Sequence, residues 1–296
     1  MTALSDADLP GVMGERRRLI NIAYRLLGSL TDAEDAVQEA YARWYAMSPE
    51  QRGAIRAPGA WLTTVAGRIC LDLLGSARAR RERYVGEWVP EPLPAPAEWA
   101  AADPADRVTL DESVTMAFLV MLESLTPAER VAYVLHEVFG YSFAEVAEIV
   151  ARTPAACRQL ATSARRRVRA LPAATTPVAA QAGIVRQFRV AWEAGDIAAL
   201  IGLLDPRATA VADGGGVVSA VPGPVVGAEQ IARYAVAIAA MAPMVIMERS
   251  VNGVPGLVAQ RDGVTVLVMA FEVADDRIRR IWGVRNPDKL RGWGAD

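Results

Sequence analysis

Side chains suited to general acid–base catalysis are scarce in this chain. Its single histidine is His136, which excludes a catalytic histidine dyad. The remaining candidate acids are four carboxylates of the C-terminal third, in segments where strands normally project such groups to solvent: Asp213, Glu229, Glu248 and Glu272. The two cysteines, Cys70 and Cys157, are too few for a zinc ribbon or a disulfide framework. The sequence therefore predicts a protein that is not an enzyme and that holds no cofactor and no metal ion.

Length and composition exclude several classes of protein. The chain has 296 residues, of which 52% are hydrophobic, so it is far too apolar to be disordered. Two cysteines, and an N-terminus with acids but no apolar core, predict a cytoplasmic protein without a secretory signal. The longest apolar run, 234–247, contains a proline and is too short to span a bilayer. The formal net charge of −2 would argue against a nucleic-acid partner. A whole-chain sum, however, does not show where the charges lie, so a basic surface is still compatible with it.

Two proline-rich segments divide the chain into three parts. Alternating prolines in VPEPLPAP (89–96) block helix and sheet and favour an extended spacer. A second break, 171–177, follows a long predicted helix. The predicted boundaries are a helical domain, a linker, a second helical domain and an α+β domain: 10–87, 88–104, 105–171 and 178–296.

The periodicity of apolar residues changes along the chain. The first two parts have helical spacing. Gly28 to Asp32 separates two predicted helices, and Thr31 or Asp32 is able to cap the second of them. The third part begins with helical patterns at 178–194 and 227–241. Short apolar segments follow, separated by three predicted hairpin turns: Asn252-Gly253, Asp262-Gly263 and Asp275-Asp276. Helices followed by a strand meander indicate an α+β domain with one curved sheet.

The strongest local pattern runs from Thr126 to Ala170. A helix (127–139) opens at Thr126-Pro127, and a short helix (143–150) is followed by Thr153-Pro154 and a longer helix. The apolar positions expected to be buried are Phe143, Val146, Ala147, Val150, Ala156, Leu160 and Ala164. This succession is typical of a helix-turn-helix, in which the second helix enters the DNA major groove.

Basic and amide side chains occupy the exposed positions of that second helix. Arg158 and Gln159 lie near its N-terminus, where they would face base edges. Arg165, Arg166 and Arg167 lie further along, against phosphates. The alternative is an ordinary helical hairpin with a basic, solvated face. We favour DNA binding, because the capped spacing, the short-then-long helices and the terminal arginines occur together.

The first part of the chain resembles a known family. RLLGSLTDAEDAVQE (25–39) and WLTTVA (61–66) resemble region 2 of the extracytoplasmic-function sigma factors of bacterial RNA polymerase. The helix-turn-helix is similar to region 4 of these factors, and the order of the domains agrees. The resemblance implies that a polar helix face, otherwise simply solvated, contacts the polymerase clamp helices: Asp32, Glu34, Asp35, Gln38 and Glu39.

The same resemblance implies a second DNA surface. Trp61, at a helix start, is either a core anchor or an aromatic that supports strand separation by stacking. A basic stretch downstream would track promoter phosphates: Arg68, Arg78, Arg80 and Arg81.

Three further segments narrow the resemblance to a subgroup that carries a fused SnoaL-like domain. WVPEPL (88–93), DGGG (213–216) and NPDKL (286–290) are similar to signatures of that subgroup and occur in the same order. They imply a cystatin-like α+β cone with a pocket, placed after two all-α sigma domains. The residues implied in an intramolecular regulatory interface are Trp88, Pro90, Glu91, Pro92, Asp213, Gly214, Gly215, Asn286, Pro287, Asp288 and Lys289.

The sequence thus predicts an alternative sigma factor that binds core RNA polymerase, at its clamp helices and flap, and directs it to promoter DNA. The C-terminal domain would tune this activity intramolecularly, with a small-molecule ligand in its pocket as a further partner and no membrane contact. One alternative is a ligand-responsive helix-turn-helix regulator with a SnoaL-like sensor domain. The other alternative is a SnoaL-type enzyme fused to a DNA-binding module. The absence of histidine from the C-terminal domain counts against it.

Overall fold

The computed structural model describes residues 9–81, 86–95, 114–169, 176–241 and 243–294. They form two compact units. The helical unit comprises residues 9–80 and 121–169, and the sheet unit comprises 86–95, 114–120 and the described residues from 176 onward. The linker segment 86–95 therefore belongs structurally to the sheet unit, although it directly follows the first helices in sequence. No helix in these described ranges is long and apolar enough to cross a membrane.

The first half of the helical unit consists of α1 (Leu9–Leu27), α2 (Leu30–Ala46), α3 (Pro49–Gly53) and α4 (Pro58–Arg81). Gly28 breaks α1 from α2 in the left-handed region, with φ 68°. Thr31 and Asp32 are the two cap candidates in the sequence, but neither of them caps α2. The cap is Ser29, whose hydroxyl accepts from the Asp32 amide at 3.2 Å, because the helix begins at Leu30, two residues before the start that a Thr31 cap would give.

The second half of the helical unit contains the predicted helix-turn-helix. It is built from the last residues of α5 (Met116–Glu123), then α6 (Pro127–Tyr133) with a π turn, η2 (Val134–Val138), α7 (Phe143–Val150) and α8 (Pro154–Arg169). Capping boxes open α6 and α7, and the hydroxyl of Thr153 caps α8 as predicted. The buried face of α8 differs from the prediction.

Of the α8 positions predicted to be buried, Ala164 is fully buried, whereas Ala156 and Leu160 are only partly covered. Cys157 and Ala161 are buried as well. The small side chains let α8 approach α6 and α7 closely. Apolar periodicity could not distinguish this register from its neighbour, because alanine occurs on both faces of the helix.

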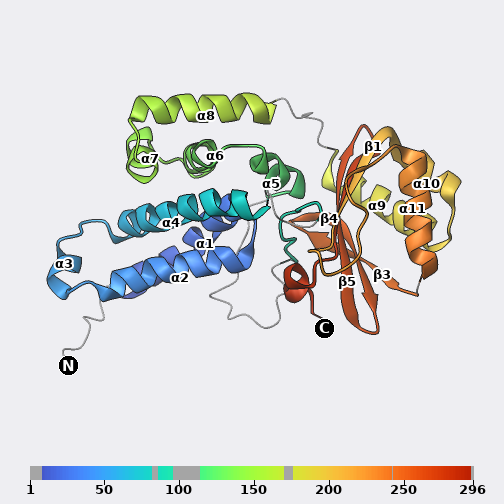
Figure 1. Cartoon of the computed structure of the whole chain (residues 1–296), viewed down its shortest axis with the longest axis horizontal. Helices are drawn as coiled ribbons and strands as arrows, with labels where there is room; N and C mark the ends of the chain where they lie inside the picture. The colour runs from blue at the N-terminus through green and yellow to red at the C-terminus, as the bar shows by residue number, and fades with distance from the viewer. Residues whose placement is uncertain (1–8, 82–85, 96–113, 170–175, 242, 295–296) are drawn as a thin grey trace. The chain divides into compact units, whose positions relative to one another are not determined.

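The sheet unit is a six-stranded sheet with three helices against one face (Figure 1). The helices are α9 (Val178–Glu193), α10 (Ile197–Leu203) and α11 (Ala228–Met241), and a 3-10 helix, η3 (Pro287–Trp293), follows the last strand. The strands are β1 (Leu204–Asp213), β2 (Val225–Val226), β3 (Val245–Val251), β4 (Val254–Arg261), β5 (Val264–Ala274) and β6 (Arg277–Val284). Their order is β2-β1-β6-β5-β4-β3, and only the β1–β6 pair is parallel.

The predicted meander from β3 to β6 is confirmed. In all three predicted turns both central residues have positive φ, as in Asn252 (52°) and Gly253 (78°), which is the twist that two-residue hairpins need. Strand β1 was not predicted. Its segment contains Pro206 and lacks clear alternation, and its main partner is β6, far away in sequence.

Both faces of the sheet are buried. The helices cover one face through a core that includes Phe188, Trp192 and Phe271. The opposite face carries a second apolar core, to which Val89 of the linker, Met116 of α5 and Trp293 of η3 contribute. Linker and sheet therefore share one hydrophobic core.

Candidate functional sites: a linker clamp and the helix-turn-helix

A buried ion pair holds the linker in the sheet unit. The ammonium of Lys289 lies 2.7 Å from Oδ2 of Asp213, whose side chain is completely buried. The same Oδ2 accepts the amide of Val89 at 2.9 Å, and the ammonium also donates to the Val89 carbonyl. One linker residue thus has both its backbone polar groups bound by a charged pair. Hydrogen bonds to ionised groups are among the stronger ones in proteins, and burial increases their strength.

The fold brings these two charges together from distant segments. Asp213 ends β1, and Lys289 lies in η3, just after the end of β6. The Asp213 carbonyl accepts the amides of Arg285 (2.7 Å) and Asn286 (3.0 Å), which continues the parallel pairing past the strand ends. Gly215, with φ 68°, packs so close to Asn286 that a Cβ would lie 2.5 Å from the side-chain amide carbon. The DGGG and NPDKL segments therefore meet as one structural element.

A second tether holds the linker further along. Leu93 exchanges hydrogen bonds with Asn252: its carbonyl accepts the Asn252 amide at 2.8 Å, and its amide donates to Asn252 Oδ1 at 3.3 Å. The indole of Trp293 donates to the Pro92 carbonyl at 2.9 Å, and Pro94 bridges to Val251. Because prolines lack an N–H and favour extended backbone, this segment presents carbonyls to the sheet unit. We call the linker clamp the set Asp213, Asn252, Lys289 and Trp293 together with the bound linker segment 88–94.

The clamp includes many of the predicted regulatory residues. The ring of Trp88 lies 4.2 Å from the Lys289 ammonium, a cation–π contact, and Pro90, Glu91 and Pro92 are buried. Gly214 and Gly215 form the turn after Asp213. Pro287 and Asp288 are exposed, and Asp288 pairs with Arg291 outside the clamp. Asn252 and Trp293 are clamp residues that we did not predict. The turn at Asn252 is visible in the sequence, but nothing local shows that its side chain binds the linker.

The exposed face of α8 carries the predicted base-reading residues. Arg158 and Gln159 are exposed, and the Arg158 guanidinium lies over the Phe143 ring at 5.4 Å, which orients it near the start of the helix. Phe143 in turn stacks on His136, whose Nδ1 is 2.8 Å from the Tyr141 carbonyl. The histidine therefore has a structural partner, as its place in a helix suggested.

The three predicted phosphate-contacting arginines differ in their surroundings. Arg165 forms an ion pair with Glu137, and Arg167 donates to the Ser124 carbonyl at 2.9 Å. Arg166 is exposed and has no polar partner among the residues that the structure describes. Within the described residues, its guanidinium is the one of the three whose five N–H donors are all without an internal partner.

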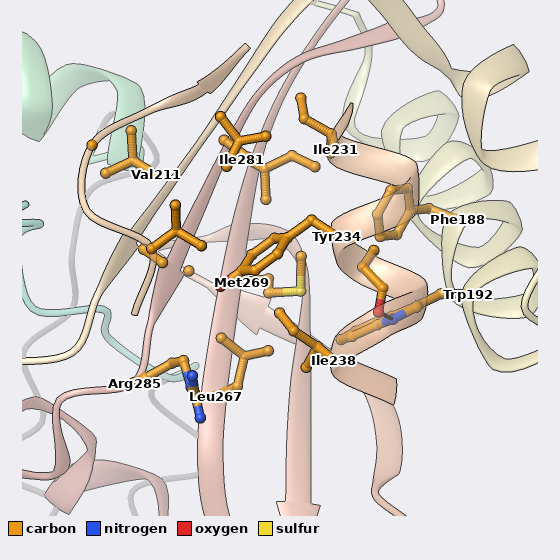
Figure 2. A pocket seen from close by; sticks show the side chains of 17 residues that line it. Phe188, Trp192, Val211, Ile231, Tyr234, Ile238, Leu267, Met269, Ile281 and Arg285 are labelled. Atoms are coloured by element: carbon orange, nitrogen blue, oxygen red, sulfur yellow. Dashed lines mark hydrogen bonds between the residues drawn. The ribbon is translucent and has the colours of Figure 1, made fainter. Parts of the chain in front are cut away.

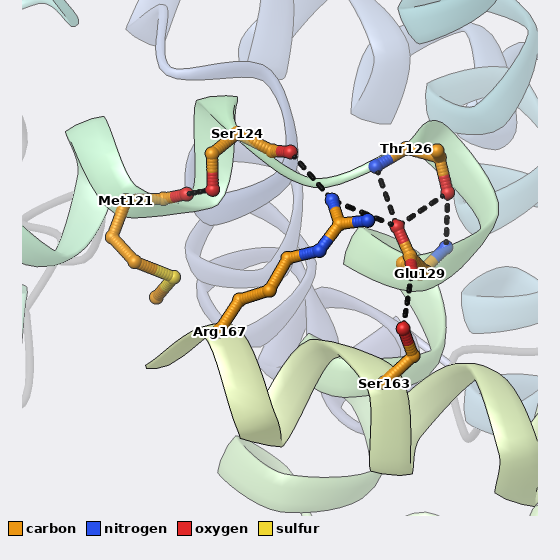
Figure 3. Close-up of polar contacts among 6 residues, drawn as sticks. All are labelled: Met121, Ser124, Thr126, Glu129, Ser163 and Arg167. Atoms are coloured by element: carbon orange, nitrogen blue, oxygen red, sulfur yellow. Dashed lines mark hydrogen bonds and ion pairs between the residues drawn. The ribbon is translucent and has the colours of Figure 1, made fainter. Parts of the chain in front are cut away.

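Glu129 joins α6 to α8, as Figure 3 shows. Its Oε2 accepts from the amide (3.0 Å) and hydroxyl (2.8 Å) of Thr126, and its Oε1 accepts from Ser163 at 2.8 Å. Arg167 completes the cluster at 3.5 Å from Oε2. Burial alone would raise the pKa of Glu129, but the hydrogen bonds from Thr126 and Ser163 and the charge of Arg167 hold it below its usual value.

Helix α4 packs against α7 within the helical unit. The guanidinium of Arg68 donates to the Glu148 carbonyl at 2.8 Å, and Thr63 Oγ1 lies 3.0 Å from the Tyr141 hydroxyl. A Cβ on Gly67 would lie 2.9 Å from Ile149 Cγ2, so the helices are in close contact there. Arg68, predicted to bind DNA, is thus engaged by the helix-turn-helix.

A buried arginine makes a further contact between the two halves of the helical unit. Arg130 of α6 is 3% exposed and donates to the Leu26 carbonyl of α1 at 2.8 Å and to Glu123 at 2.7 Å. Burial lowers the pKa of Arg130 to about 10, which still leaves it charged at neutral pH.

The remaining predicted residues lie on α2 and α4. Trp61 is half-buried against Trp44, with ring centroids 5.3 Å apart. The side chains of Arg78, Arg80 and Arg81 lie outside the described residues. The predicted polymerase-facing residues are all exposed on one helix: Asp32, Glu34, Asp35, Gln38 and Glu39.

Comparison with known proteins agrees with this arrangement. The family described as Sigma-70 region 2 matches residues 12–80, and the family described as Sigma-70, region 4 matches residues 115–168. The chain is 38% identical to the ECF RNA polymerase sigma factor SigJ of Mycobacterium tuberculosis, over 94% of this chain and 91% of that protein. It is 35% identical to the probable ECF RNA polymerase sigma factor SigI of the same species, over 93% and 92% of the two chains.

A solved structure extends the likeness to the fold. The crystal structure of Mycobacterium tuberculosis SigJ matches with a TM-score of 0.76 and 34% identity, covering 96% of this chain and 98% of that one. The predicted fold class, two helical sigma domains followed by an α+β SnoaL-type cone, is confirmed.

The first prediction concerns Glu129. Because its pKa is lowered in the folded protein, the ionised carboxylate stabilises the fold at neutral pH, and this contribution is lost as the pH falls through the folded pKa. We expect Glu129→Gln to reduce the opening free energy of α6 by about 1–3 kcal/mol at pH 7, and by progressively less as the pH falls below the usual glutamate range and through the lowered folded pKa. Native-state hydrogen exchange of the α6 and α8 amides measures this.

Glu145→Gln is the matched control. Glu145 holds the same capping-box position at the start of α7 but is exposed, so we expect a loss of less than about 1 kcal/mol. Equal losses in the two variants at pH 7, or a Glu129→Gln effect that does not change with pH, would contradict the role given to the buried carboxylate.

The second prediction concerns Lys289. Lys289→Met leaves the Asp213 carboxylate buried without its cation, which we expect to weaken linker attachment by about 3–5 kcal/mol. The additional change Asp213→Asn should recover part of this loss. Exchange protection of the Val89 amide, which donates to Asp213, reports the effect. Arg291→Met, on the same 3-10 helix but exposed, should leave Val89 protected. Unchanged protection of Val89 in Lys289→Met would show that the ion pair does not hold the linker.

Proposed function

This chain belongs to the extracytoplasmic-function sigma factors of RNA polymerase, and from that membership we propose how its parts divide the work. The exposed polar face of α2 docks on the clamp helices of core RNA polymerase. The helix-turn-helix, through Arg158, Gln159 and Arg166, reads the upstream promoter element, and α4 acts at the downstream element. We expect this activity in the cytoplasm, where RNA polymerase works. The sheet unit performs no chemistry and tunes the activity through the linker.

The observation that carries the regulatory part is the linker clamp. The linker follows α4 in the chain and precedes the helix-turn-helix, so its position constrains both. The clamp holds it at Val89 and again at Leu93, and Met116, on the far side of residues 96–113, packs into the same apolar core. Because the chain is held on both sides of that stretch, releasing the clamp lengthens the free connection between the two sigma domains.

Contacts within the helical unit support a closed, unengaged form. Arg68 donates from Nε and Nη2 to the Glu148 carbonyl, so these two groups must leave α7 before the whole guanidinium can bind a phosphate. The close approach of Gly67 to Ile149 excludes other molecules from this part of α4. We infer that polymerase or promoter binding separates α4 from α7.

The sigma-factor assignment explains features that the alternatives leave without a role. A ligand-responsive regulator that used the helix-turn-helix alone would need neither the α2 polar face nor the helical domain that carries it. A SnoaL-type enzyme would need a titratable group inside the C-terminal pocket. The polar side chains lining the pocket that the structure describes are those of Trp192, Tyr234 and Arg285, none of which is an ordinary general base at neutral pH.

The polymerase-facing surface is tested by charge reversal. Asp35→Lys places a cation at the centre of the α2 polar face, and we expect it to weaken binding to purified core polymerase by about tenfold or more. Glu50→Lys, on the exposed surface of α3, is the control and should bind like the wild-type chain. Fluorescence anisotropy of the labelled full chain measures the affinity. Failure of the wild-type chain to bind core polymerase would overturn the sigma-factor function itself.

Restraint by closure is tested with the same assay. If only an open form binds, the apparent affinity is reduced by the fraction of chains that are open. Gly67→Leu wedges α4 away from Ile149 while favouring helix, and Lys289→Met releases the linker. We expect each to tighten core binding by about three- to tenfold.

Gly75→Leu, on the same helix α4, is the matched control for Gly67→Leu, because a Cβ at Gly75 would have no atom within 4 Å. It should leave the affinity unchanged. If Lys289→Met frees the Val89 amide but core affinity stays the same, the clamp does not restrain the sigma domains, although the sigma-factor function would stand.

A further inference from the structure

The sheet unit contains a narrow apolar pocket between its helices and the sheet. Its volume is about 60 Å³, and its walls come from α9, α11, the strands β1, β5 and β6, and the segment around Val221 and Gly223 (Figure 2). Tyr234 reaches from α11 across the pocket toward the strands, and Arg285 lies at the margin of the lining residues. Ile231, Leu267 and Ile281 complete the apolar wall.

Only three lining residues carry polar side-chain groups. The Trp192 indole is already engaged, because it donates to the Ala235 carbonyl at 2.7 Å. The Tyr234 hydroxyl has no polar partner within the described part of the chain. No aspartate or glutamate is among the described residues that line the pocket. Arg285 supplies the single charge. Its guanidinium donates to the Ser219 carbonyl and pairs with no carboxylate in the ranges that the structure describes.

These features define the chemistry of a ligand. An apolar cavity with one permanent cation at its margin favours a molecule with an apolar body and one anionic end. A guanidinium pairs with a carboxylate through two parallel hydrogen bonds, and a phenol hydroxyl can donate one more. The volume is well below the roughly 150 Å³ of a cavity that holds benzene. If the carboxylate stays at the margin, only the alkyl end of the ligand must enter, and an unbranched chain of about four carbons takes up less of this space than the six carbons of a benzene ring.

We propose that this pocket binds a small aliphatic monocarboxylate, with its chain between α11 and the sheet and its carboxylate on Arg285 near the Tyr234 hydroxyl. Binding would displace the guanidinium from the neutral Ser219 carbonyl, which a carboxylate outcompetes as an acceptor.

The pocket and the linker clamp share two strand ends. Ala212 lines the pocket and directly precedes Asp213, and Arg285 directly precedes Asn286. The Arg285 amide donates to the Asp213 carbonyl at 2.7 Å, so the backbone of the ligand-binding arginine is bonded to the clamp aspartate. Ligand binding is thus coupled to the clamp. The regulatory meaning of this coupling rests on the proposed function, whereas the binding itself does not.

Methyl-labelled full-length protein, titrated with n-pentanoate and followed by NMR, tests the proposal. We expect saturable shifts of the Ile231, Leu267 and Ile281 methyl signals. Arg285→Gln and replacement of pentanoate by the uncharged 1-pentanol should each weaken binding by about tenfold. Arg285→Lys, which keeps the charge but loses the paired hydrogen bonds, should weaken binding less than Arg285→Gln does. Arg261→Gln, which changes an exposed arginine at the end of β4, should bind like wild type.

The indole signal of Trp293, which donates to the linker, reports the coupling in the same titration. It should move with pentanoate, while the Trp44 signal of the helical unit stays in place. Absence of saturable methyl shifts would overturn the site. Equal affinity for 1-pentanol, or no effect of Arg285→Gln, would overturn the carboxylate class. Pocket shifts without movement of Trp293 would overturn the coupling. None of these readouts uses polymerase, so failure here is distinct from failure of the sigma-factor function.

Discussion

The Asp213–Lys289 pair is buried, and a buried charge is tolerated only when its partner and its hydrogen bonds are all present. That requirement connects three distant parts of the chain. The aspartate needs the lysine and the Val89 amide, and the lysine needs the aspartate, the Val89 carbonyl and the Trp88 ring. The linker therefore supplies some of the polar groups that replace water around this buried pair. Removing the linker from the sheet unit would expose the pair to water or leave it unsatisfied.

This constraint gives the only lysine of the chain a specific place. Of 32 basic residues, all except Lys289 are arginine. A compact ammonium can donate to a carboxylate and a carbonyl at once while lying on an indole ring, whereas the planar guanidinium is larger and delivers its hydrogen bonds in a fork. The chain uses arginine at the exposed face of α8 and at the margin of the apolar pocket. In both places a planar, permanently charged group suits phosphate or carboxylate.

Local signals predicted most of the elements. Thr126-Pro127 opens α6, Thr153 caps α8, and Asn252-Gly253 is a two-residue hairpin, so these features follow from residues close in sequence. The prediction failed where the partner is distant or the pattern is degenerate. Strand β1 depends on β6, and the register of α8 depends on alanines that occur on both faces. The net charge of −2 likewise concealed an acidic face on α2 and arginines on α8.

The sequence by itself determined the family, the two helical domains and the segments WVPEPL, DGGG and NPDKL as features that belong together. It did so because each is a contiguous pattern of residue types. Only the tertiary structure decided what those segments do to one another. It placed Val89 between Asp213 and Lys289, bound Asn252 and Trp293 to the linker and set Arg68 against α7. Such contacts depend on which strand ends and helix faces meet in space, and no local pattern encodes that meeting.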